Sequence, residues 1–136
     1  MGCWGPDSFD NDTACDWAWD LVEANNLSFI EKPLDRVLNF GDESLDSWVA
    51  EKGLAAAETI ARLKGNWGDR DSYTAWMDMW VETSELVPSR ALIEKALKAI
   101  ERILSEPSDM LKLWTDSKYL AEWKESVKEL SDRLSA

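Results

Sequence analysis

The sequence predicts an all-α fold, a single compact multi-helix bundle of about six to seven helices that spans residues 1–136 as one domain. In several segments apolar residues recur three and four positions apart, which is the spacing of one buried helix face. No segment alternates apolar and polar residues over the length of a strand. Nine tryptophans supply the apolar area that a core needs in a chain of 136 residues.

The first expected helix follows an irregular segment, residues 1–11, in which glycines and a proline prevent regular structure. Asp12 or Thr13 is expected to cap this helix, which runs to about Ala24 and ends at two asparagines. Its apolar stripe comprises Ala14, Trp17, Ala18, Leu21 and Val22.

The second expected helix has two candidate starts. Ser28 and Glu31 have the spacing of a capping box, whereas Pro33 suits the first helical position because it has no backbone N–H to satisfy. A third segment begins at Ser44 and is expected to break at Gly53. An alanine-rich helix then runs to about residue 64, and residues 65–70 form a loop.

Three further helices and one short turn complete the expected bundle. Asp71 or Ser72 caps the first of these helices, and Pro88 opens the second. Pro107 begins the short turn, and Ser117 caps the last helix. Six tryptophans lie on the apolar faces and are predicted to pack in the core: Trp17, Trp48, Trp76, Trp80, Trp114 and Trp123.

The net charge of −12 is unevenly distributed, with −10 in residues 1–60 and −2 in residues 61–136. Nucleic acids and anionic membranes are disfavoured as partners because both require Lys and Arg side chains. No apolar run is long enough to span a membrane. The acidic half favours a basic protein partner, although acidity that serves solubility alone would look the same in the sequence.

The residue types disfavour catalysis. There is no histidine, so neither a Ser-His nor a Cys-His pair can form, and two cysteines without histidine do not make a structural zinc site. We expect no cofactor and no metal. An enzyme or ligand-binding protein that uses the N-terminal carboxylates remains an alternative, yet these carboxylates lack the EF-hand pattern and fit a solvated or partner-facing helix side.

One face of the first helix is the candidate partner-binding site. It carries a row of carboxylates, and Trp19 stands at its edge, about 130° from the centre of the buried stripe. A large aromatic side chain beside carboxylates has the composition of a hot spot for a basic partner. In the alternative arrangement, Trp19 packs beneath the N-terminal segment against Trp4 or Phe9. The candidate residues are Asp12, Asp16, Trp19, Asp20 and Glu23.

The N-terminus resembles a bacterial family of unknown function whose members begin Met-Gly-x-Trp-Gly and continue Phe-(Asp/Glu)-Asn-Asp. The matching positions are Trp4, Gly5, Phe9, Asn11 and Asp12, followed by Asp16, Trp17, Asp20 and Leu21. The resemblance implies that Trp4, Phe9 and Asn11 dock the N-terminal segment onto the bundle. The sequence departs from the family at residues 6–8, where glycine-containing spacers are commoner.

These observations together favour a protein-binding module. Because small acidic families of this kind often contain toxin-neutralising immunity proteins, the resemblance implies a bacterial immunity protein that blocks a basic toxin. A cytoplasmic location and a monomer or homodimer are expected with it. A homo-oligomeric structural protein is a further alternative.

Overall fold

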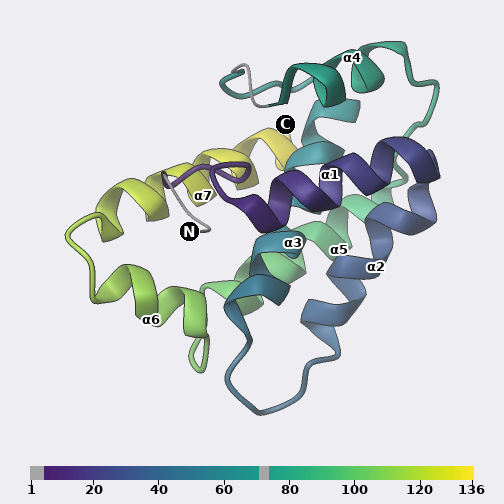
Figure 1. Cartoon of the computed structure of the whole chain (residues 1–136). Helices are drawn as coiled ribbons and strands as arrows, with labels where there is room; N and C mark the ends of the chain where they lie inside the picture. Colours follow the sequence, from purple (N-terminus) through teal and green to yellow (C-terminus); the bar gives the residue numbers. More distant parts are fainter. Residues whose placement is uncertain (1–4, 71–73) are drawn as a thin grey trace.

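The computed structural model describes residues 5–70 and 74–136, and in this part the chain forms seven helices and no strand (Figure 1). The expected all-α bundle is confirmed. No described helix is both long enough and apolar enough to cross a lipid bilayer. The helices are α1 (Asp12–Ala24), α2 (Leu27–Leu38), α3 (Ser47–Leu63), α4 (Ala75–Thr83), α5 (Arg90–Ile103), α6 (Asp109–Thr115) and α7 (Leu120–Ser135).

Helix α3 is the centre of the fold and packs against each of the other six helices (Figure 1). From Gly53 to Arg62 every residue of α3 is buried, so no face of this stretch is left to solvent. Its alanines are short, which lets the surrounding helices approach closely without a gap. The alanine-rich sequence therefore makes α3 a good helix former and also suits it to a fully enclosed position.

The predicted break at Gly53 is wrong, because α3 runs through this glycine without interruption. A Cβ atom at residue 53 would lie 2.8 Å from Cγ2 of Val37 in α2. The glycine thus marks a close approach of α2 and α3, and this packing offsets the roughly 1 kcal/mol that glycine costs inside a helix.

The predicted end of α1 at about Ala24 is correct, but the two asparagines that follow it change the predicted start of α2. Asn25 ends α1 in the left-handed conformation, with φ of 53°, and Asn26 caps α2 by accepting a hydrogen bond from the Phe29 N–H at 2.8 Å. Neither Ser28 nor Pro33 begins α2, and Pro33 lies buried inside it. At the start of α1, Asn11 takes the place predicted for Asp12 or Thr13 and accepts from the Ala14 N–H at 2.7 Å.

The remaining helices begin within a few residues of their predicted starts. Helix α5 is capped by Ser89 rather than opened by Pro88, and α6 is capped by Ser108. Helix α7 begins at Leu120 because Ser117 accepts from the Tyr119 N–H in a turn before the helix. The cap predicted at residues 71–72 lies outside the described residues.

The predicted core is correct for Trp17 and Trp123, which are both buried. Three more of the six tryptophans, Trp76, Trp80 and Trp114, are partly buried and pack against the core. Trp48 is 46% exposed, so its assignment to the core is wrong. It lies in the first turn of α3, where its ring is flanked by basic side chains rather than covered by another helix.

We expect Gly53→Ala to lower the free energy of unfolding by about 1 kcal/mol, because the steric conflict with Val37 exceeds the gain in helix propensity. Urea denaturation would measure this change. In a Val37→Ala background the same substitution should be neutral or stabilising. If Gly53→Ala stabilises both backgrounds equally, close packing does not explain this glycine.

Candidate functional site

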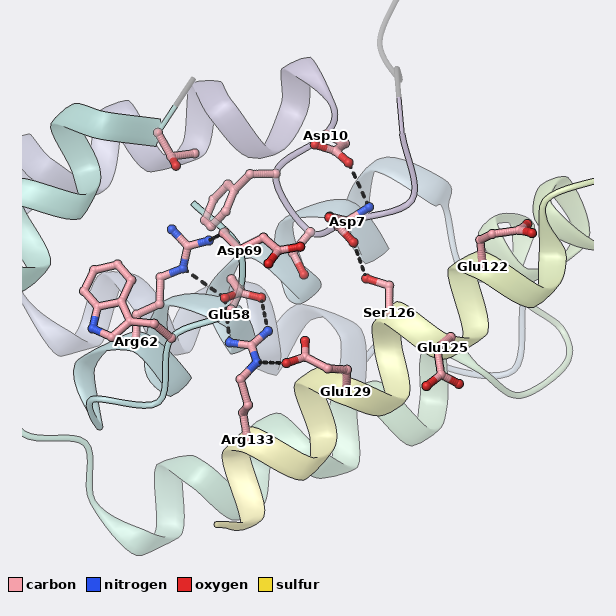
Figure 2. A pocket seen from close by; sticks show the side chains of 15 residues that line it. Asp7, Asp10, Glu58, Arg62, Asp69, Glu122, Glu125, Ser126, Glu129 and Arg133 are labelled. Atoms are coloured by element: carbon pink, nitrogen blue, oxygen red, sulfur yellow. Dashed lines mark hydrogen bonds and ion pairs between the residues drawn. The ribbon is translucent and has the colours of Figure 1, made fainter. Parts of the chain in front are cut away.

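A cavity of about 590 Å³ opens where the segment before α1, the loop after α3 and helix α7 meet (Figure 2). Its wall includes buried side chains of α3, and its rim is formed by the N-terminal segment and by α7. Asp7 accepts a hydrogen bond from Ser126 of α7 at 2.7 Å, which fixes the N-terminal segment against that helix. The cavity therefore joins parts of the chain that are far apart in sequence.

The wall of the cavity contains a buried network of ion pairs centred on Glu58. Arg62, one turn further along α3, donates from Nε to Glu58 at 2.9 Å and from Nη1 to Asp78 of α4 at 2.6 Å. Arg133 of α7 donates from both Nη atoms to the two oxygens of Glu58, each at 2.8 Å. Glu58 is thus held by two guanidinium groups, one from its own helix and one from α7 (Figure 2).

Each guanidinium nitrogen of the two arginines donates to a protein acceptor. Arg133 also donates from Nε to Glu129 at 2.6 Å and from Nη1 to the Asn66 carbonyl at 3.1 Å. The remaining nitrogen of Arg62, Nη2, donates to the Asp69 carbonyl at 3.3 Å. Every guanidinium nitrogen of the pair has a protein partner, so the network acts as a structural clamp that joins α3, α4, α7 and the loop over residues 65–70.

Aromatic rings cover Arg62. Its guanidinium carbon lies 5.2 Å from the centre of the Phe9 ring and 5.4 Å from the centre of the Trp67 ring. Phe9 is buried there, and Asn11 caps α1 two residues later. The docking of the N-terminal segment by these two residues stays a prediction. Trp4, the third residue assigned to docking, lies outside the described residues.

The environment of Glu58 keeps its carboxylate ionised. Burial alone would raise the pKa of Glu58, but the hydrogen bonds from Arg133 and the charges of Arg62 and Arg133 outweigh burial. The pKa of Glu58 therefore lies below its ordinary value of 4.5.

The rim of the cavity is strongly acidic. Seven carboxylates line the cavity against two guanidinium groups, a formal charge of −5. Six of the seven carboxylates belong to the N-terminal segment, the loop after α3 and helix α7, and the two arginines pair within the wall with Glu58, Asp78 and Glu129. A ligand or partner with positive charge is favoured there. The rim carboxylates are those of Asp7, Asp10, Asp69, Glu122, Glu125 and Glu129.

The acidic face predicted on α1 is exposed to solvent: Asp12, Asp16, Asp20 and Glu23 all lie outside the core. Trp19 is 57% exposed and contacts Trp76 of α4 edge-to-face, with ring centroids 4.8 Å apart. The alternative arrangement of Trp19 against Phe9 is not observed.

The charge of Asp12, at the start of this face, acts on the carboxyl group of Glu51 in α3. Burial contributes most to raising the pKa of Glu51, a hydrogen bond with Thr13 opposes the rise, and the negative charge of Asp12 adds to it.

Sequence reasoning missed the Glu58 network and the cavity beside it. A signal was present, because Glu58 and Arg62 stand four residues apart inside an alanine-rich helix that has few other polar residues. Their partner Arg133 lies 75 residues beyond Glu58, a separation that helix periodicity does not bridge.

The fold and the site define a small helical-bundle protein with a buried ionic clamp and an acidic surface. The chain belongs to the family described as Domain of unknown function (DUF4259), whose model matches residues 2–126. Membership in a family of unknown function, expected from the N-terminal motif, is thereby confirmed. No curated protein and no solved structure matches the chain.

We expect Glu58→Ala to lower the free energy of unfolding by about 3–5 kcal/mol, because it leaves two guanidinium groups without their shared carboxylate. Urea denaturation would measure the loss. Glu129→Ala is the matched control, since this carboxylate also binds Arg133 but is half exposed. Its removal should cost less than about 1 kcal/mol. Equal losses would show that Glu58 is not the centre of the network.

The lowered pKa of Glu58 also predicts a pH dependence. As the pH falls below 4.5, the unfolded chain takes up a proton at Glu58 before the folded chain does, so acid favours unfolding. The stability that the Glu58 charge contributes is fully present above pH 4.5 and is lost below it. The difference in unfolding free energy between the wild type and Glu58→Gln should therefore shrink on acidification. A difference that stays constant down to pH 2, roughly the lower limit for a salt-bridged carboxyl, would contradict this assignment.

Proposed function

We propose that the protein is a binding module for a basic protein, and specifically an immunity protein that occludes a basic toxin. The observation that carries this proposal is the formal charge of −5 on the side chains that line the cavity, where both arginines are already paired with carboxylates of the protein. The acidic face of α1 is a second group of carboxylates, and its first member, Asp12, follows directly in the chain on the N-terminal segment that lines the cavity. A cytoplasmic location and a monomer or homodimer are parts of the same proposal.

The spacing of the carboxylates supports a protein partner. Asp12, Asp16 and Asp20 stand four residues apart on α1, and Glu125 and Glu129 are spaced in the same way on α7. Side chains four apart on a helix are separated by roughly 6 Å. Rows of this kind suit several Lys and Arg side chains on one protein surface, and they also speed the encounter with such a surface.

Trp19 supports the same proposal as an apolar anchor. Its ring is more than half exposed, and the edge contact with Trp76 restrains it before any partner arrives. A restrained aromatic side chain loses little conformational entropy on binding. The neighbouring carboxylates of Asp16, Asp20 and Glu23 would surround it with charge complementary to a basic partner.

We expect Trp19→Ala to weaken partner binding by about 2 kcal/mol or more, which is roughly a 30-fold rise in Kd, with little change in thermal stability. The partner would be sought by coexpression with the products of neighbouring genes and purification at low and high salt. Titration calorimetry on the purified complex would then measure the effect.

Trp17→Ala is the matched control, because Trp17 is buried two residues away on the same helix. It should destabilise the free protein by about 3–5 kcal/mol. If Trp19→Ala destabilises the free protein as much, or if the partner that is found has an acidic surface, the proposal fails.

A further inference from the structure

A second, smaller pocket lies between α2 and the first turns of α3, and its charge is opposite to that of the cavity. Its volume is about 180 Å³. The floor is apolar and is formed by Trp17, Phe29, Pro33 and Val49. The rings of Trp17 and Phe29 stack there, with centroids 5.8 Å apart, which makes the floor rigid.

The rim of this pocket gathers the positive charge of the acidic half of the chain. Residues 1–60 contain three basic residues in total, and all three, Lys32, Arg36 and Lys52, line the pocket. The exposed ring of Trp48 lies among them, 5.3 Å from the guanidinium carbon of Arg36 and 5.7 Å from Nζ of Lys52. We call this combination of floor and rim the Trp48 groove.

The cations of the Trp48 groove are not neutralised by neighbouring carboxylates. Helix α2 also carries Glu31 and Asp35, but both pair with Lys95 of α5, at 2.6 and 2.7 Å. Within residues 5–70 and 74–136, no salt bridge involves any of the three rim cations. The two sides of α2 therefore differ: one is paired with α5, and the other presents positive charge around an exposed tryptophan.

The size of the groove indicates what it accommodates. Pockets that enclose whole small-molecule ligands measure roughly 300–1,000 Å³. A volume of about 180 Å³ instead suits one bulky apolar side chain, with the rest of the ligand lying over the rim. The three cations of the rim favour an anionic ligand outside the pocket. Exposed Trp and Arg are also among the residue types that most often anchor protein interfaces.

We propose that the Trp48 groove docks an acidic segment of a partner protein, which inserts one bulky apolar side chain against Trp17 and Trp48. Carboxylates on either side of that side chain pair with Lys32, Arg36 and Lys52. This proposal does not rest on the proposed function, because it concerns another surface and the opposite charge.

The probe for the experiment is a blocked pentapeptide, acetyl-Glu-Asp-Phe-Asp-Glu-amide, titrated into the full chain labelled with nitrogen-15. We expect a saturable shift of the Trp48 indole N–H signal in the NMR spectrum. A peptide with Ala in place of Phe should bind at least about 10-fold more weakly, because the apolar contact is lost. A peptide with Lys in place of the four acidic residues should not shift the signal.

Variants then assign the site. Trp48→Ala and Arg36→Glu should each weaken binding at least about 10-fold. The matched control is Arg90→Glu, which makes the same charge change at a fully exposed position on α5 and should leave the affinity unchanged. Trp19→Ala should also leave it unchanged, which separates this test from that of the proposed function. Circular dichroism confirms that each variant is folded.

Four results would overturn the proposal. The first is the absence of a saturable shift, and the second is an equal loss of affinity in Arg90→Glu and Arg36→Glu, which would reduce the effect to net charge. The third is binding of free 3-phenylpropionate as tight as that of the peptide, which would make the groove a small-molecule site. The fourth is a dimer in sedimentation experiments that Trp48→Ala dissociates, which would make a second copy of the chain the occupant.

Discussion

The enclosure of α3 by six other helices is the constraint on which the rest of the structure depends. The stretch of α3 from Gly53 to Arg62 has no solvent-facing side and has to satisfy its polar side chains within the protein, because a buried charge without a partner costs several kcal/mol. Glu58 and Arg62 lie in this enclosed stretch. They are compensated by Asp78 from α4 and by Arg133 from α7, so the positions of these two helices are tied to the charges of α3.

The clamp also determines what the cavity beside it presents to solvent. Since Arg62 and Arg133 direct all their guanidinium nitrogens to protein acceptors, the positive charge near the cavity is internally compensated. The carboxylates of the rim therefore dominate the electrostatic potential at the opening of the cavity. An interior requirement of folding thus produces an acidic opening, and this link between core and surface is the physical basis of the proposed binding to a basic partner.

Helix periodicity predicted the fold class and located most elements, because the apolar stripes of α1, α5 and α7 are regular. It failed where a local signal has two readings. Asn25 and Asn26 together looked like one helix end, whereas the first ends α1 and the second begins α2. Trp48 lies on an apolar stripe, yet periodicity does not reveal whether another element covers the end of a helix. The acidic face of α1 could be predicted from the spacing of its residues along one helix. The cavity and its clamp could not, because they depend on contacts between distant segments that no local pattern encodes.

The arrangement of α1 explains how two surfaces of opposite charge coexist on one small domain. Trp17 and Trp19 are two residues apart, so their side chains point about 200° apart around the helix axis. Trp17 forms part of the floor of the Trp48 groove, and Trp19 stands at the edge of the acidic face beside α4. Both tryptophans belong to α1, and α1 packs against α3. Because the two surfaces share no side chain and are mounted on a rigid core, substitutions in one should act independently of substitutions in the other. The proposed basic partner and the proposed acidic segment would therefore bind at separate sites without competing with each other.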